Sequence, residues 1–398
     1  MRDRASDPLA SALAAVSAER AAAFTLDLVR IRSYTGETRE VAQRFVEELR
    51  SLGFETQLHD AYRQTPVVIG RLRGTGGGPT LILNGHLDTV PIPHAEPERR
   101  DGFVYGRGAA DMKGPIAAAV EAVRAARVAG LQFRGDLLFC AHGLHEAPGG
   151  TSEDLAAAIA DGAVQGDAAV VLELGHDSLV VVQLGMGIFR AVFRRAGAAT
   201  HELKTPDRTP NPALAAAEAA LALEELDERL RAVEIPHAGR ESVFLGQIHA
   251  GDFYNRHAES AWIEGTRRYS PERRAADAER ELRALLEPVA SRRGVSLELS
   301  FHCVREGCRI DESHPLSRAL RLAYQQETGE DLPVQGSRVV ADAGVFHAAG
   351  IPCLYHGLAG EGAHADVERV SEAELSRGAR TYLRLLASYV GICPPSAA

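Results

Sequence analysis

Apolar and polar positions follow two different periods in the first half of the chain. Residues 8–50 place apolar side chains at helical spacing, with a break near residues 33–36. Short β-rich apolar runs follow, and an alanine-rich helical segment at residues 112–129 lies among them. The runs cover residues 67–72, 80–83, 136–140, 168–172 and 179–183. Strands that alternate with helices predict an α/β fold, a mixed sheet covered by helices as α/β/α layers.

The order of predicted elements changes in the middle of the chain. A strand at 188–195, a helix at 211–233, strands at 242–250 and 260–269, a helix at 271–293 and a strand at 296–302 give the order βαββαβ. That order is typical of a ferredoxin-like module. The α/β pattern then resumes with a helix at 314–327, a strand at 351–355 and a helix at 371–390. We therefore expect a first domain at 1–186 and 306–398, with an inserted domain at 187–305.

Composition narrows the choice of partners and location. A chain of 398 residues is too long for one ordinary core, which agrees with two domains. Its net charge of −10 argues against nucleic acid as a partner, and no apolar run approaches the ~18 residues that span a membrane. Five cysteines, an odd number without a CxxC pair, and an N-terminus without a signal-like apolar segment predict reduced thiols and a cytoplasmic protein.

Potential metal ligands recur where predicted strands end. In the segment Leu81–Pro91, His86 and Asp88 follow the apolar run of a predicted strand, and Glu146 and Glu173 follow two later predicted strands. Asp111 precedes the alanine-rich helix, and His364 lies in a glycine-rich loop. Each has an ordinary explanation when taken alone: a loop hydrogen bond for His86, a helix N-cap for Asp111, a solvated strand end for Glu173. Ligands in open α/β sheets gather at the carboxyl ends of strands, which is where His86 and Asp88 are expected.

Two stretches, HLDTVP at 86–91 and GRGAADMKG at 106–114, carry a resemblance to a known family. The chain resembles the dinuclear-zinc amidohydrolases and peptidases that include acetylornithine deacetylase, succinyl-diaminopimelate desuccinylase, carboxypeptidase G and aminoacylase-1. The resemblance implies two divalent cations, held by His86, Asp111, Glu146, Glu173 and His364, with Asp88 orienting His86. Imidazole and carboxylate ligands favour Zn²⁺, with Co²⁺ or Mn²⁺ as substitutes. The implied reaction is hydrolysis of an amide in a small N-acyl amino acid or dipeptide that bears a free carboxylate.

One position departs from that family. Its general base is the first Glu of a Glu-Glu pair, and this chain has His145 there. Histidine can act as a base or orient water, since its ordinary pKa lies near ~6.5. The ring could instead bind a metal, or be inert. The corresponding functions are an amidohydrolase, an altered C–N cleavage such as deamination at the same metals, and a non-hydrolytic binding protein.

Three residues of the predicted inserted domain also match the family. His201 matches a histidine that reaches the partner's active site in dimeric relatives, which implies a homodimer through this lid domain. Asn255 and Arg268 match positions that hold the substrate carboxylate, a task that suits the planar fork of arginine. Spacing alone leaves Arg267, next to Arg268, as an alternative.

Overall fold

The computed structural model describes residues 7–147 and 149–393. Among these residues the chain divides into two compact units. Unit 1 comprises Met1–Val181, Arg309–Gln335 and Ala341–Ala398, and unit 2 comprises Val182–Cys308 and Gly336–Val340. No single described helix is long and apolar enough to cross a membrane; α1 (Pro8–Ala14) and α2 (Ala18–Arg30), bent by 58°, meet that criterion only as a pair.

A large mixed sheet forms the centre of unit 1. Its strands follow the order β1-β2-β7-β3-β8-β18-β9-β16, with β17 paired to β9. The bounds are β1 Glu55–His59, β2 Val67–Leu72, β3 Leu81–His86, β7 Leu137–His142, β8 Ala168–Val171, β9 Leu179–Gln183, β16 Cys308–Arg309, β17 Val334–Ser337 and β18 Cys353–Tyr355. Neighbours β7, β3, β8 and β18 are parallel. The carboxyl ends of these four strands therefore lie at one edge of the sheet.

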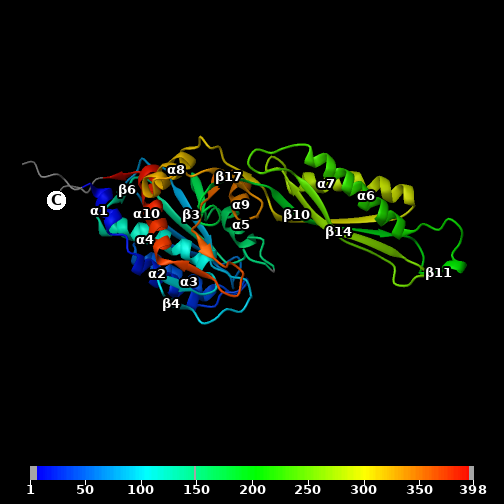
Figure 1. The fold of residues 1–398 in the computed structure, drawn as a ribbon, viewed down its shortest axis with the longest axis horizontal. Helices are drawn as coiled ribbons and strands as arrows, with labels where there is room; N and C mark the ends of the chain where they lie inside the picture. The colour runs from blue at the N-terminus through cyan, green and yellow to red at the C-terminus, as the bar shows by residue number, and fades with distance from the viewer. Residues whose placement is uncertain (1–6, 148, 394–398) are drawn as a thin grey trace, which may run out of the picture. The chain divides into compact units, whose positions relative to one another are not determined.

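Helices cover this sheet through apolar faces. Helices α2, α4 (Gly114–Val128), α8 (Pro315–Thr328) and α10 (Glu372–Leu385) pack together, and α3 (Arg39–Ser51) packs on β1 and β2 (Figure 1). Helix α5 (Glu153–Ala160) packs on β2, and helix α9 (Ala343–Ala348) packs on β8 and β18. Helix α4 approaches β3 closely: a Cβ on Gly85 would lie 2.7 Å from Ile116 Cγ1. A glycine is therefore required one residue before His86.

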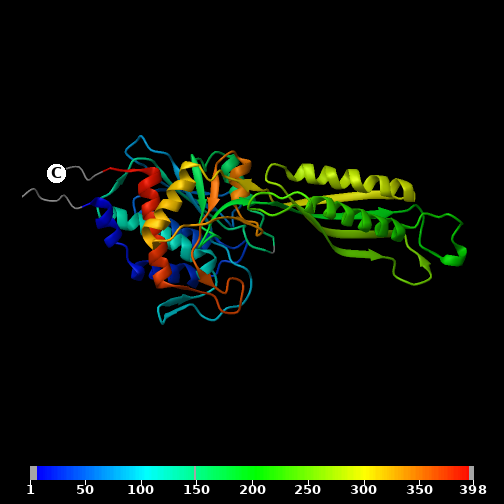
Figure 2. The same cartoon turned by 45° about the horizontal axis from the view of Figure 1, so that its top comes forward.

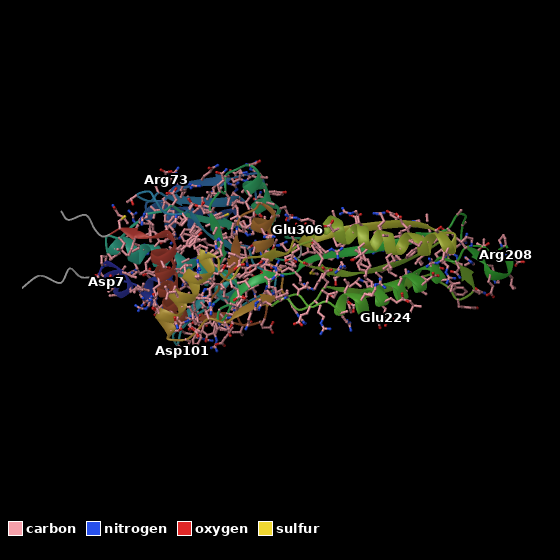
Figure 3. The ribbon with its side chains drawn as sticks, turned by 90° about the horizontal axis from the view of Figure 1, so that it is seen from above. Asp7, Arg73, Asp101, Arg208, Glu224 and Glu306 are labelled. Atoms are coloured by element: carbon pink, nitrogen blue, oxygen red, sulfur yellow. The ribbon has the colours of Figure 1, made fainter. Side chains whose placement is uncertain are left out.

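Unit 2 has the element order β10 (Gly185–Arg194), α6 (Pro212–Arg231), β12 (Ser242–Ala250), β14 (Ser260–Tyr269), α7 (Ala275–Arg293) and β15 (Ser296–Arg305). The four strands form an antiparallel sheet in the order β12-β14-β10-β15. Both helices lie along one face of it (Figures 1 and 2). Alternate residues of β10, such as Phe189 and Phe193, pack against these helices in the core of the unit. Exposed side chains such as Glu224 project from the outer side of α6 (Figure 3).

Most predicted elements have counterparts in the structure. The predicted bounds of β2, β9, β12 and β14 agree with the observed ones, and the other predicted strands differ at their ends. Helix α7 begins at Ala275, four residues later than predicted, because Asp277 accepts a hydrogen bond from the backbone N–H of the N-cap residue Arg274 at 2.9 Å. The helix predicted from residue 112 begins at Gly114. Helices α5 and α9 were not predicted, since both are short and flanked by loops.

Candidate metal centre

The carboxyl edge of the parallel strands brings the predicted ligands of unit 1 together. His86 is the last residue of β3, and Glu173 follows β8 by two residues. Glu146 lies in the loop after β7, whereas Asp111 comes from a distorted helical turn, Ala109–Lys113, before α4. Binding sites in open α/β sheets form at such an edge. The fold therefore explains why these separate segments meet.

Asp111 is the central member of this group. Its Oδ1 lies 3.1 Å from His86 Nε2, and its Oδ2 lies 3.4 Å from His364 Nε2. His364 Nε2 is also 2.9 Å from Glu146 Oε1. Asp111 thus turns one oxygen to each of two histidines, as a carboxylate that bridges two cations would. Its interpretation as an N-cap is wrong, because α4 begins three residues later and Asp111 has φ −127° and ψ 95°.

Asp88 is fully buried and supports the site in two ways. Its backbone carbonyl lies 3.0 Å from His86 Nδ1, and its Oδ1 lies 3.5 Å from the same nitrogen. Its Oδ2 accepts the backbone N–H groups of His145 (3.0 Å) and Glu146 (2.8 Å). Asp88 therefore orients His86, mainly through its backbone oxygen, and fixes the loop that carries the His-Glu pair.

Glu368 supports Asp111 from behind and was not predicted from the sequence. Its Oε1 accepts the backbone N–H groups of Ala110 (2.9 Å) and Asp111 (3.0 Å). Its Oε2 accepts a hydrogen bond from Arg107 at 2.9 Å, and Arg107 also donates to the carbonyl of Ala365. Both charged side chains are buried. The Arg107–Glu368 ion pair therefore links the turn that carries Asp111 to the segment just after His364.

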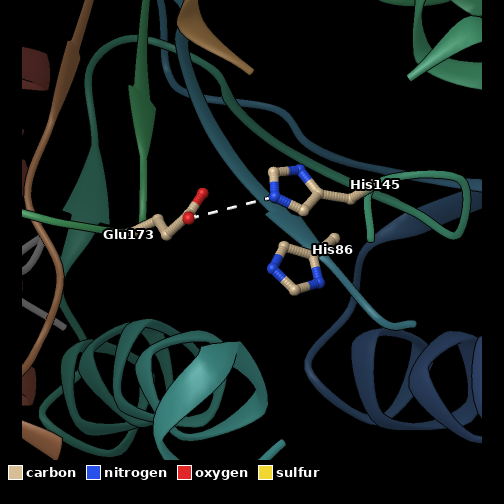
Figure 4. A group of neighbouring side chains, drawn as sticks. All are labelled: His86, His145 and Glu173. Carbon is tan, nitrogen blue, oxygen red and sulfur yellow. Dashed lines mark ion pairs between the residues drawn. The ribbon is translucent and has the colours of Figure 1, made fainter. Parts of the chain in front are cut away.

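His145 lies inside the same group. Its ring stacks on that of His86, with centroids 4.1 Å apart and planes 5° from parallel. Its Nε2 lies 3.9 Å from Glu173 Oε1 (Figure 4), whereas its Nδ1 lies 3.0 Å from Asp342 Oδ2. The family position of a general base therefore holds an imidazole that faces the ligand cluster with one nitrogen.

The pKa values follow from burial and from this mixture of charges. Burial opposes a charge on His86, but Asp111 and Asp88 raise its pKa well above the ordinary value. Burial likewise opposes a charge on Asp111, but hydrogen bonds with His364 and His86 lower its pKa strongly. The bond to Asp111 raises the pKa of His364 to about 9, and burial raises that of Glu173 to about 7. A divalent cation competes with protons for these nitrogens, so binding would release protons.

The donor set fits divalent cations. Ligand atoms of His86, Asp111 and Glu146 lie within 4.8 Å of one another, and so do those of His86, His145 and Glu173. The Oε2 atom of Glu173 is buried and has no hydrogen-bond partner among the described residues. A buried carboxylate oxygen without a donor is costly, and a cation would satisfy it. His364 adopts φ 61°, a conformation that non-glycine residues tolerate mainly at functional sites.

The three predicted residues of unit 2 do not form one cluster. His201 and Asn255 are neighbours, with His201 Nε2 3.1 Å from Asn255 Nδ2. His201 ends strand β11 (Thr200–His201), and Asn255 is the residue just before β13 (Arg256–His257), which pairs with β11. This pair lies beyond the Ser260 end of β14 (Figure 1). Arg268 is next to last in that strand, which is about 30 Å long at ~3.3 Å per residue. Asn255 and Arg268 of one chain therefore cannot hold the same carboxylate.

The register of β14 separates Arg268 from Arg267. Arg267 is fully buried and pairs with Glu241 and Glu281 inside unit 2. Arg268 points to the other face of the strand and lines a cavity of about 420 Å³ with Arg240 and Arg338. Burial, together with the nearby Arg338, lowers the pKa of Arg268. Of the two neighbours, only Arg268 is available to an anion.

Comparison with known proteins agrees with this architecture. Residues 82–388 match the model of peptidase family M20/M25/M40. The chain belongs to this family. It is 25% identical to N-formyl-4-amino-5-aminomethyl-2-methylpyrimidine deformylase of Bacillus subtilis, over 86% of this chain and 87% of the relative. It is 28% identical to succinyl-diaminopimelate desuccinylase of Cereibacter sphaeroides, over 92% and 98% of the two chains.

Solved structures show the same fold. Aminopeptidase PepT from Bacillus cereus superposes with a TM-score of 0.78 at 19% identity, covering 94% of this chain and 99% of that one. An M20-family metallo-carboxypeptidase from Sulfolobus solfataricus gives 0.72 at 17% identity, over 93% and 99%. Membership of the M20/M25/M40 family makes this chain an amide-bond hydrolase of the amidohydrolase and peptidase type.

Sequence reasoning missed a set of buried residues behind the metal centre. They are Arg107 and Glu368, described above, and Ser152, Asp154 and Asp342, which together with His142 surround the far side of His145. His142 ends a strand, and this position was the one available signal. Asp342 precedes a short helix with no periodic pattern, and nothing in the sequence relates it to His145.

Proposed function

We propose that this chain hydrolyses the amide bond of a small N-acyl amino acid or dipeptide-like substrate, with two divalent cations at the metal centre. The observation that carries the proposal is the position of Asp111 between His86 and His364, with Glu146 beside His364 and Glu173 near His145. These five residues would hold the cations. When bound, such a pair acidifies a water molecule and polarises the scissile carbonyl. Zn²⁺ is the cation that we propose, with Co²⁺ and Mn²⁺ as substitutes.

His145 would take the proton from the attacking water and return it to the leaving nitrogen. Its Nε2 faces Glu173 and lies beside the ring of His86, which is the side where the cations would bind. Asp88 would keep His86 in place through the contacts at its Nδ1. Because neutral imidazole accepts one proton, histidine can perform the exchange that a glutamate performs in the family the sequence resembles.

Arg268 would bind the free carboxylate of the substrate. Together with Arg240 and Arg338 it lines one cavity, and none of these three arginines has an ion-pair partner among the residues that the structure describes. The cavity is also lined by Arg231 and by one carboxylate, Glu241, which pairs with Arg267 and Arg273, so positive charge predominates there and favours an anionic ligand. An acidic substrate end therefore suits this part of unit 2.

We further propose that unit 2 is a ferredoxin-like lid through which the chain forms a homodimer. Its edge strand β12 exposes Phe244 (65%) and Ile248 (53%), and an exposed apolar edge strand is a ready pairing surface. His201 and Asn255 would then act on the centre of the second chain, since they lie far from Arg268 of their own. A mass measurement in solution tests this arrangement. All five cysteines are free thiols, which supports a cytoplasmic location.

The deciding experiment is an assay of N-acyl amino acids and dipeptides with Zn²⁺, Co²⁺ or Mn²⁺, on wild type and on His145→Ala. We expect His145→Ala to abolish turnover while metal content remains near two per chain. Full activity of the variant would refute the assignment of His145. If wild type cleaves none of the substrates but His145→Glu does, the chain is a binding protein and not a hydrolase. Release of ammonia without acyl transfer to water would indicate deamination.

A further inference from the structure

A buried polar network lies directly behind His145. Asp342 is fully buried, and its Oδ2 lies 3.0 Å from His145 Nδ1 and 2.9 Å from His142 Nε2. Its Oδ1 accepts the hydroxyl of Ser152 at 2.5 Å. His142 Nδ1 in turn lies 3.3 Å from Asp154 Oδ1. Both oxygens of Asp342 therefore accept hydrogen bonds, and the three donor groups all belong to the segment at residues 142–152.

These contacts define which nitrogen of His145 carries its proton. A carboxylate only accepts hydrogen bonds, so the nitrogen that faces Asp342 must be Nδ1–H. In the neutral ring the lone pair then belongs to Nε2, which lies 3.9 Å from Glu173 Oε1. Stacking on His86 prevents the ring from rotating away (Figure 4). The imidazole thus has a fixed plane, a fixed tautomer and one nitrogen directed at the metal centre.

We propose that Asp342 is the positioning residue that allows histidine to serve at the base position of this chain. A glutamate at that position exposes two equivalent oxygens and needs no tautomer to be selected. An imidazole has two different nitrogens, and it functions only when the correct one faces the substrate. Asp342 makes that selection by holding Nδ1–H. The inference rests on the proposed function, because it assigns how His145 comes to act in that reaction.

The neighbouring contacts separate this role from that of a simple buried ion pair. His142 already has a carboxylate of its own in Asp154, which also accepts the backbone N–H of Gly143 at 2.8 Å. Asp342 is the carboxylate that contacts both histidines, whereas Asp154 contacts only His142 among them. Asp154→Asn is therefore a matched control, since it perturbs the same buried network without touching His145.

The test compares Asp342→Asn and Asp154→Asn in the zinc-loaded, full-length enzyme. An asparagine amide can donate to Nδ1 and so reverse the tautomer of His145. We expect Asp342→Asn to lower kcat by about 100-fold or more, as loss of a histidine-orienting carboxylate does elsewhere, with KM changed less than about twofold. Asp154→Asn should keep kcat within about threefold. Asp342→Glu, which retains a carboxylate, should recover part of the loss.

Nitrogen-15 NMR of histidine-labelled wild type gives a readout that does not need turnover. The resonance of His145, assigned by its loss in His145→Gln, should show a protonated Nδ1 and an unprotonated Nε2. An Nε2–H tautomer, or equal losses of kcat in the two Asn variants, would overturn the inference. If wild type hydrolyses no amide, the proposed function fails instead, while the NMR result still decides the tautomer. If Asp342→Asn does not fold, the wild-type spectrum alone is decisive.

Discussion

Replacing Glu368 by glutamine should weaken unit 1 more than any exposed charge substitution. Glu368 is 1% exposed and its partner Arg107 is 9% exposed, so the pair is shielded from water. Glutamine keeps an oxygen for the N–H groups of Ala110 and Asp111, but then directs its amide N–H₂ at the guanidinium. Removing one partner of a buried ion pair costs about 3–5 kcal/mol. We expect about 3 kcal/mol, because Arg107 keeps its bond to the Ala365 carbonyl.

Thermal unfolding of the metal-free chain measures this loss. For a unit of this size, about 3 kcal/mol corresponds to a decrease in Tm of roughly 6–12 °C. Far-UV circular dichroism follows both units, whereas fluorescence of Trp262, the single tryptophan, follows unit 2. Glu361→Gln is the matched control, since its side chain is 60% exposed and pairs with Arg369 at the surface. Equal shifts for the two variants, or a shift confined to the Trp262 transition, would refute the reasoning.

Three further outcomes follow from the structure. Gly143→Ala should lose about 1–3 kcal/mol of unfolding free energy, because its Cβ would lie 2.0 Å from Thr38 Oγ1; unchanged denaturant midpoints would contradict this. Burial lowers the pKa of His142, but the carboxylates of Asp342 and Asp154 raise it from 6.5 to about 10. The contribution of protonated His142 to the free energy of unfolding is therefore complete below pH 6.5 and is lost as the pH rises through 10. Stability curves of wild type and His142→Gln should therefore converge at alkaline pH, and parallel curves would exclude this linkage. Arg268→Ala should raise KM for carboxylate substrates about 10-fold or more while unit 2 stays folded. Arg267→Met should instead lower the unfolding midpoint that Trp262 fluorescence reports. The reverse pattern would exchange the roles of the two arginines.

The fold was predictable wherever a segment's pattern matched its tertiary surroundings. Strand β14 alternates buried and partly exposed residues along its whole length, so its bounds agree with the sequence pattern. The start of α4 was not predictable, because it depends on a distant contact. The ammonium group of Lys113 is buried and donates to the carbonyls of Leu28 and Ile31 and to Ser33 Oγ. These contacts hold the preceding turn out of helical geometry, and no local pattern encodes them.

The residues of the candidate site likewise include some that the sequence pattern predicts and some that depend on distant contacts. The strand-end residues His86 and Glu173 could be found because the carboxyl edge of a parallel sheet gathers whatever follows its strands. Asp342 could not, since it lies 197 residues from His145 in a segment without periodicity. Sequence reasoning identified the histidine as a departure but left its role open among three alternatives. A base and a metal ligand both need an unprotonated nitrogen that faces the cluster, and the sequence does not show which nitrogen of His145 does so.

A histidine can perform the proposed proton transfer only if its tautomer is defined. A histidine without a carboxylate at Nδ1 has two accessible neutral tautomers, and in one of them Nε2 carries the proton. Asp342 removes that freedom, because its carboxylate only accepts hydrogen bonds and its Oδ2 lies 3.0 Å from His145 Nδ1. In the proposed reaction the base would therefore be a carboxylate–imidazole pair, in which the proton-accepting atom and the charge that directs it belong to two different segments of the chain.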